Sequence, residues 1–219
     1  PLSSARKCTT LSVAAHTLYE KTNPYILPGP GGHLDLAETT FEQDSENTVK
    51  VKGTRYVTAP QYTIKLEGAK CIGYRTVSVA GTRDPIMISK IDDIVEGVRA
   101  RVADNYRDKG YKYNLNFTIY GKNGVMGDLE PVKDAHPHEL GIVIEVVADT
   151  QEQADTICAS ARSTMLHYGY EGRRATAGNL AFPFSPSDFH AGRVYVFSMY
   201  HIIEVEDPTS LFPIDIVTL

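Results

Sequence analysis

The chain has 219 residues, of which 42% are hydrophobic and 22% charged, and its formal net charge is −5 at pH 7. A chain of this length buries enough surface to fold without disulfides or a structural metal. Its scattered basic residues disfavour a nucleic-acid or membrane partner. No apolar run reaches the roughly 18 residues that a transmembrane helix needs, and three cysteines are too few for a disulfide framework. We therefore expect a soluble cytoplasmic protein with reduced thiols, no metal and no cofactor.

The first residues combine a start without methionine with an early helical pattern. Apolar residues three and four positions apart predict a helix over residues 10–20, which Asn23-Pro24 ends. Thr9 or Thr10 is suited to cap it. A trimmed chain, an omitted start or a cleaved precursor would each begin in this way, and we favour a piece of a longer protein. Such a piece leaves apolar surface uncovered, so we expect a complex with an upstream chain or a homo-oligomer.

Residues 25–35 include six Pro, Gly or Asp residues among eleven, which predicts a shaped loop. The loop carries His33 and Asp35, an imidazole and a carboxylate suited to proton transfer. It matches neither the phosphate-loop nor the dinucleotide fingerprint. The alternative is a rigid turn that feeds a strand and leaves His33 merely exposed. After it, β-branched and aromatic residues alternate with polar ones over residues 39–74, which predicts two or three antiparallel strands.

From residue 71 onward the pattern predicts four strands and two helices. The strands are apolar or alternate strictly, and the helices show apolar residues three and four positions apart. Ser89 is suited to cap the first helix, and a capping box at Thr150 opens the second. The six elements in order are a strand at 71–79, a helix near 90–109, strands at 111–120 and 140–148, a helix near 151–168, and a strand at 193–205.

This β-α-β-β-α-β order predicts an α+β fold, the ferredoxin-like split β-α-β-β-α-β sandwich. We expect it over residues 71–219, with both helices on one face of a four-stranded antiparallel sheet because their apolar stripes need a common core. Residues 1–70 would then be an N-terminal helix and β-rich segment docked on this domain.

Two loops of the predicted domain favour an anion site. Residues 81–85 lie between a strand and a capped helix, so backbone amides and Arg83 can hold a carboxylate or phosphate. The alternative is a turn in which Arg83 and Asp84 satisfy each other. In a split sheet this loop ends the first strand and residues 172–188 lead into the last, so we expect the two loops to meet.

Residues 172–188 combine two arginines with small residues and an apolar wall of Phe182 and Phe184. Guanidinium groups that hold an anion while an apolar tail packs on aromatic rings suit an acyl-CoA or a branched carboxylic acid. The alternative is a crossover loop whose phenylalanines close the edge of the core. The residues that we expect to bind substrate are Arg83, Asp84, Arg173, Arg174, Asn179, Ser185 and Asp188.

Two other features are weaker candidates. Residues 134–139 contain two histidines and two carboxylates, but Pro137 between the histidines argues against a metal pair and favours a solvated loop. Cys71 and Cys158 fall on elements that we expect to be buried, where thiols are inert. Cys8 precedes a helix beside Lys7 and is the one thiol worth testing.

Five runs of residues carry a resemblance. They are residues 16–20 (HTLYE), 31–35 (GGHLD), 62–68 (YTIKLEG), 73–85 (GYRTVSVAGTRDP) and 180–188 (LAFPFSPSD). With them the chain resembles the acyclic terpene utilisation (AtuA) family over most of its length, most specifically at residues 65–85. The resemblance implies that a Rossmann-like α/β half precedes this portion, and that it serves bacterial breakdown of branched acids and terpenoid acyl-CoA esters. Residues 3–8 (SSARKC) depart from the glycine pair expected before the first helix.

Together these patterns favour part of an enzyme, a lyase or hydratase that works next to a carboxylate or thioester. His33 or Asp35 would move the proton. Arg83, Arg173 and Arg174 would hold the anion and any developing enolate charge. The alternative is a non-catalytic assembly subunit, in which the sheet pairs with a partner chain and the loops form the interface.

Overall fold

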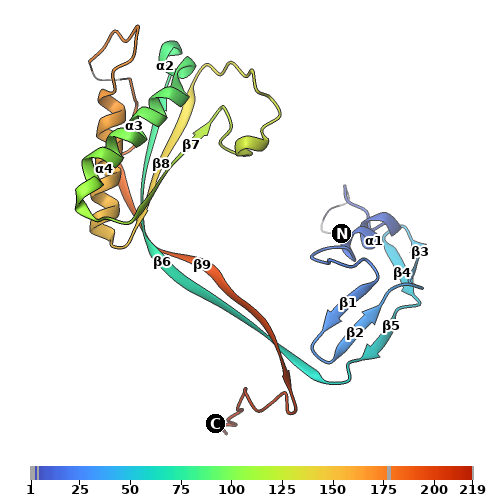
Figure 1. The fold of residues 1–219 in the computed structure, drawn as a ribbon. Helices are drawn as coiled ribbons and strands as arrows, with labels where there is room; N and C mark the ends of the chain where they lie inside the picture. Colours follow the sequence, from blue (N-terminus) through green and yellow to red (C-terminus); the bar gives the residue numbers. More distant parts are fainter. Residues whose placement is uncertain (1–2, 4, 177–178, 219) are drawn as a thin grey trace. The chain divides into compact units, whose positions relative to one another are not determined.

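The computed structural model describes residues 3, 5–176 and 179–218 (Figure 1). The chain forms two compact units, a terminal unit of Pro1–Gly68 with Ser198–Leu219 and a central unit of Ala69–Phe197. Helices and strands are mixed, which confirms the α+β class. Within the described residues, no helix has the length and apolar character to cross a membrane.

The central unit is built on a four-stranded sheet with the order β7-β8-β6-β9. Strand β8 pairs antiparallel with both neighbours, so that Ala148 lies opposite Tyr74 on one side and Tyr113 on the other. The predicted strands at 71–79 and 193–205 are parts of longer ones, since β6 begins in the terminal unit and β9 begins at Asp188, inside the central unit. The bounds are Tyr62–Thr82 for β6, Tyr113–Tyr120 for β7, Leu140–Ala148 for β8 and Asp188–Val205 for β9.

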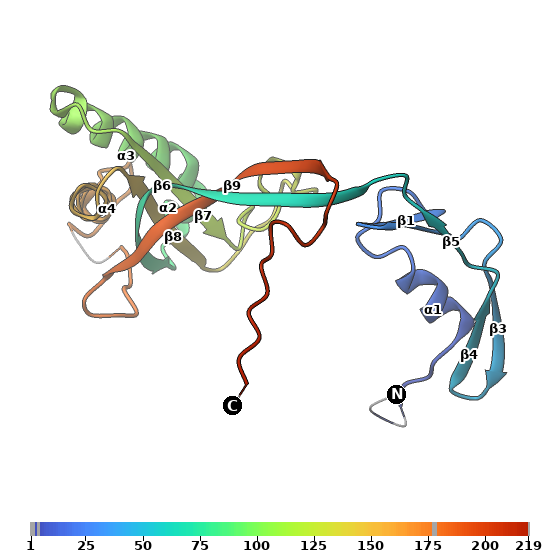
Figure 2. The ribbon, with the colours of Figure 1, turned by 90° about the horizontal axis from the view of Figure 1, so that it is seen from below.

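Two long helices, α3 (Ile91–Tyr106) and α4 (Gln151–His167), lie side by side on one face of this sheet (Figures 1 and 2). Every second residue of β7 and β8 points into the layer between helices and sheet, and all of these residues are buried except Tyr113, which is partly buried. This layer is the hydrophobic core. Its fully buried members include Ile94, Val98, Val102, Ile142, Ile144, Val146, Ile157 and Met165.

The helix boundaries differ from expectation at one point. A short helix α2 (Pro85–Ser89) precedes α3 and is capped by Asp84, whose side chain accepts a hydrogen bond from the Ile86 N–H at 2.9 Å. The predicted cap of α3 at Ser89 is wrong, because Ser89 ends α2 and α3 has Lys90 as its N-cap, without a side-chain cap. Ser89 instead donates its hydroxyl to the Ile86 carbonyl. The predicted cap at Thr150 is confirmed, since its hydroxyl accepts from the Gln153 N–H. The reciprocal half of the predicted capping box does not form, because the Gln153 Oε1 atom has no hydrogen-bond partner among the described residues.

The terminal unit holds the helix α1 and small sheets. The prediction of a loop at 25–35 is wrong, because residues 26–35 form a hairpin that turns at Pro30-Gly31. Proline is tolerated in an edge strand, and Pro28 lies in one. Strands β1, β2 and β5 form one sheet, and β3 and β4 another. The bounds are Thr10–His16 for α1, Ile26–Gly29, Gly32–Asp35, Thr40–Ser45, Thr48–Lys52 and Arg55–Thr58 for β1 to β5.

The two units differ in the number of side chains that they bury. Among the described residues of the terminal unit, only Gly32 is buried, and a Cβ there would lie 2.3 Å from the Val57 carbonyl oxygen. The buried apolar side chains of the described residues all belong to the central unit, between Ala80 and Val194. The described part of the terminal unit therefore has secondary structure without a hydrophobic core of its own.

Candidate functional site

A pocket of about 590 Å³ opens in the central unit, where β6 ends and β8 begins. Gly81 and Ala181 close one side of it, because each N–H donates to the carbonyl of the other at 2.8 Å. Two segments that the sequence singled out, residues 81–85 and part of 172–188, are thereby held together. The lining residues are Gly81, Thr82, Arg83, Asp84, Glu139, Leu140, Gly141, Asn179 and Ala181.

Asp84 has a structural task in this pocket. Besides capping α2, its carboxylate accepts a hydrogen bond from the Tyr170 hydroxyl at 2.5 Å. That bond, together with the backbone N–H groups of α2, holds the pKa of the Asp84 carboxyl below its ordinary value. Burial, followed by the nearby Asp84 carboxylate, raises the pKa of Tyr170 to about 12. Asp84 therefore stays ionised at neutral pH and Tyr170 stays a donor.

The polar groups available to a ligand come from Arg83 and Asn179. Arg83 is exposed and makes no hydrogen bond or ion pair with any described residue. The Nδ2 group of Asn179 is buried and has no hydrogen-bond partner within the described part of the chain. A buried donor without a partner costs about 1–3 kcal/mol. A ligand oxygen in this pocket would recover that cost. Arg174 adds positive charge, because it helps to lower the pKa of Asp84.

Arg173 is committed elsewhere. Its guanidinium donates to the carbonyls of Leu166 at 3.2 Å, His167 at 2.7 Å and Tyr168 at 2.9 Å, and also to that of Thr176. These carbonyls belong to the end of α4 and the residues after it. A cation at this position is favoured by the helix dipole. We assign Arg173 to holding this end of the helix in place.

Asp188 and Ser185 also lie outside the pocket. The Asp188 carboxylate forms a two-pronged ion pair with Arg162 of α4, at 2.7 and 3.1 Å, which fixes the start of β9 on the helix. Ser185 is exposed and does not line the pocket. Of the predicted aromatic wall, Phe182 packs against the core, while Phe184 is 55% exposed and contacts Phe189 edge to face.

His33 and Asp35 lie in β2 of the terminal unit, two residues apart on the same face of the strand. The Asp35 carboxylate accepts from the Ala37 N–H at 3.0 Å and pairs with Arg55 at 2.9 Å. The backbone bond from Ala37, and then Arg55, lower the pKa of Asp35. His33 is half-buried. The structure thus pairs Asp35 with a cation, and the pocket residues belong to the other unit.

The family model described as acyclic terpene utilisation family protein AtuA matches residues 3–189, most of the chain. The chain belongs to the AtuA family. No curated protein and no solved structure matches it. The matched region spans every residue that the sequence proposed for the site, from His33 to Asp188, and ends just inside β9.

Sequence reasoning assigned no role in the pocket of this AtuA-family chain to Glu139, which it placed in a solvated loop, and it missed Tyr170 and Arg162. Glu139 lines the pocket and is 59% exposed, with its carboxylate 4.0 Å from the His138 Nε2. Tyr170 and Arg162 hold Asp84 and Asp188 in place. A signal for Glu139 existed, because it directly precedes a buried strand. None existed for Tyr170 and Arg162, whose partners are remote in the sequence.

The other predicted features have different surroundings. Residues 133–137 line a second hollow beside α2, together with Lys122. No group of three or more His, Cys, Asp or Glu side chains suited to a metal occurs among the residues that the structure describes. Burial raises the pKa of Cys158 to about 12. Cys71, expected to be buried, is exposed, because it lies in the part of β6 beyond the pairing with β8.

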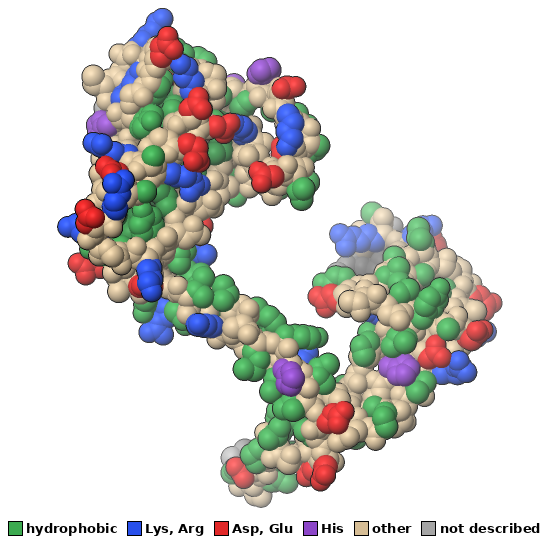
Figure 3. Space-filling view, in the orientation of Figure 1, with side chains coloured by type: hydrophobic (Ala, Val, Ile, Leu, Met, Phe, Trp, Pro, Cys, Tyr) green, Lys and Arg blue, Asp and Glu red, His purple; other side chains and the backbone are tan. Residues whose placement is uncertain are grey.

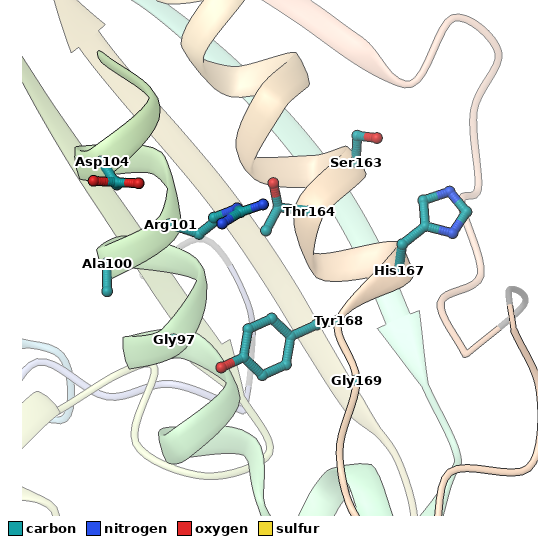
Figure 4. A pocket seen from close by; sticks show the side chains of 9 residues that line it. All are labelled: Gly97, Ala100, Arg101, Asp104, Ser163, Thr164, His167, Tyr168 and Gly169. Carbon is teal, nitrogen blue, oxygen red and sulfur yellow. The ribbon is translucent and has the colours of Figure 1, made fainter. Parts of the chain in front are cut away.

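A wider groove of about 720 Å³ runs between α3 and α4 (Figure 4). Arg101 extends from α3 toward Thr164 of α4, while the Tyr168 ring points to Gly97. A Cβ on Gly97 would lie 1.7 Å from the Tyr168 hydroxyl oxygen, so glycine permits this packing. None of the predicted site residues within the described ranges lines this groove, although Arg173 donates to the carbonyl of Tyr168, which does. We interpret the groove as a consequence of helix packing.

Proposed function

We propose that this AtuA-family chain binds a carboxylate in the pocket between β6 and β8, as part of a lyase or hydratase that acts on a branched carboxylate or its acyl-CoA thioester. The observation that carries the proposal is the pairing of an unengaged guanidinium, Arg83, with the unpartnered buried amide of Asn179 around one pocket of the described chain. Both groups are donors, and a carboxylate presents two acceptor oxygens.

The charges around the pocket set the expected orientation of the ligand. Asp84 is negative, but its oxygens accept bonds from Tyr170 and Ile86. A bound carboxylate would therefore sit toward Arg83 and Asn179. Glu139 is the lining carboxylate without a capping task, and it is suited to accept a proton from the carbon next to the bound carboxyl or thioester group.

A competing assignment gives the proton transfer to His33 or Asp35 of the terminal unit. Asp35 has a lowered pKa and an Arg55 partner, which makes it a weak base. The test of this assignment therefore uses His33. The variants H33A and E139Q separate the assignments, because only the variant that lacks the true base loses proton exchange at the α-carbon of a bound ligand, as measured by NMR in deuterated water.

Binding is tested by calorimetric titration of the full chain with 3-methylbutanoate and with its CoA thioester. We expect R83A to weaken binding about 10- to 100-fold, since a hydrogen bond to a charged group contributes about 1.5–3 kcal/mol. R101A is the matched control, because Arg101 is also an exposed arginine of the central unit but lines the groove between the helices. Equal affinity of R83A, R101A and wild type would contradict the proposal.

A second candidate function is that of an assembly subunit. It is favoured by the terminal unit, whose described residues include no buried apolar side chain. A ligand that binds tightly and is turned over by the isolated chain would argue against a purely structural role.

We also propose the ferredoxin-like arrangement for the central unit. The strand order β7-β8-β6-β9, with β6-α3-β7 and β8-α4-β9 as successive connections, supports it. An experimental structure with α3 and α4 on opposite faces of the sheet would overturn this assignment.

A further inference from the structure

The terminal unit presents an apolar hollow and an apolar segment at the same time. The hollow encloses about 540 Å³ and is lined by Pro28, Pro30, Ile64, Lys65, Ile202 and Phe212, among others. The apolar segment, residues 211–217 (LFPIDIV), follows β9 without forming a helix or strand. Figure 3 shows hydrophobic side chains at the surface around this end of the chain.

The apolar segment is uncovered in a single chain. Ile214, Ile216 and Val217 are 80%, 91% and 79% exposed. Burial of such side chains is favourable because it removes apolar surface from water. A cluster of this kind marks an interaction site rather than ordinary surface. The lack of buried apolar side chains among the described residues of this unit points the same way.

The hollow and the segment are complementary in charge as well as in polarity. Among the described residues, Lys65 is the one charged residue that lines the hollow, and its side chain is 55% exposed although it pairs with Glu67 at 2.8 Å. Asp215 is the one charged residue in the sequence of the segment and stands between Ile214 and Ile216. A segment seated in the hollow can therefore bury its isoleucines and bring Asp215 toward Lys65.

We propose that the hollow receives residues 213–217 of a second copy of this chain, the part of the segment that follows Phe212, and that two copies exchange these residues reciprocally in a dimer. The segment's own chain supplies Phe212 to the wall of its hollow, and leaves the residues after it exposed. A surface that carries both the exposed segment and the hollow that receives it is self-complementary. A two-fold interface requires such self-complementarity.

Size-exclusion chromatography with light scattering tests the dimer at micromolar concentration. We expect a mass near twice the 24.1 kDa of one chain. The variant I214S/I216S should raise the dissociation constant about 100-fold or more, because two isoleucines are lost at each seat. These side chains are almost fully exposed in one chain, so their loss leaves the fold of that chain intact, which circular dichroism verifies.

The control variant is V125S/L129S. Val125 and Leu129 are 85% and 79% exposed and lie in the central unit, so the same chemical change there should leave the mass unchanged. D215K and K65E should each weaken the dimer, and their combination in one chain should restore it. A monomeric wild type, or a dimer indifferent to I214S/I216S, would overturn the proposal. A monomer in which Ile214 and Ile216 are shielded from solvent would overturn it as well, because the chain would then cover its own hollow.

Discussion

The clearest energetic test concerns two adjacent arginines, since Arg173 and Arg174 look equivalent in the sequence but not in the structure. The Arg173 guanidinium donates to four backbone carbonyls around the end of α4, while its Nε is buried without a partner among the described residues. Arg174 is exposed, and its side chain makes no hydrogen bond with a described residue. Truncation to alanine should therefore affect the two positions very differently.

The magnitude follows from the number of carbonyls left without a donor. A hydrogen bond to a charged group contributes about 1.5–3 kcal/mol, but several of these carbonyls lie near the surface, where water replaces part of the loss. We expect R173A to lower the free energy of unfolding by about 2–4 kcal/mol, and R174A to change it by less than about 0.5 kcal/mol. For a chain of this size the first value corresponds to a melting temperature roughly 4–16 °C lower.

Urea unfolding followed by circular dichroism at 222 nm measures both variants against the wild type. R173K is a further control, because lysine keeps the charge but cannot span several carbonyls with one planar group. R173K should recover less than half of the loss. If R173A is as stable as R174A but binds the carboxylate ligand more weakly, Arg173 belongs to the binding site and the assignment to the helix end is refuted.

Two further predictions concern the surroundings of the pocket and the helix layer. Y170F should be less stable than wild type at neutral pH, and the difference should shrink as the pH falls through the lowered pKa of Asp84, because a protonated carboxyl no longer gains from the donor. The stability contributed by ionised Asp84 is complete above its ordinary pKa of 3.8 and is lost below that range, so urea unfolding over a pH series checks the sign; a difference that is constant with pH would contradict it. G97A should destabilise the chain by about 1–3 kcal/mol through the clash with Tyr168, and the added change Y168A should relieve the clash. If G97A costs as much in the Y168A background as in the wild type, measured by thermal unfolding, the packing argument fails.

Local sequence patterns predicted a strand or helix correctly where its position depends only on neighbouring residues. The strand at Leu140–Ala148 and the helix opened by Thr150 and Gln153 appear at the expected residues, because alternation and capping act over a few neighbouring positions. The cap at Ser89 was wrong for a related reason. Asp84 is followed by Pro85, a residue favoured in the first turn, so a separate short helix begins there and ends at Ser89, before α3 starts at Ile91.

Amino-acid composition gave the wrong prediction where pairing between strands decides the local structure. Residues 25–35 are rich in proline and glycine, yet they form a hairpin because β2 gains β5 as a second neighbour, and Gly32 allows the close approach of Val57. The side chain of Cys71 was expected to be buried because the residue falls in a predicted strand. Its strand extends past the four-stranded sheet, so the side chain is exposed.

By itself, the sequence determined the α+β class, the order of the four strands and two long helices of the central unit, and the resemblance to the AtuA family, because periodicity, caps and family motifs are properties of contiguous residues. Only the tertiary structure decided what each polar residue does. It gave Arg173 to the carbonyls of α4 and Asp188 to Arg162, and left Arg83 unengaged by any described residue at the pocket. The physical reason is that a charged side chain takes its role from the partners that folding places within hydrogen-bond distance, and most of those partners are remote in the sequence.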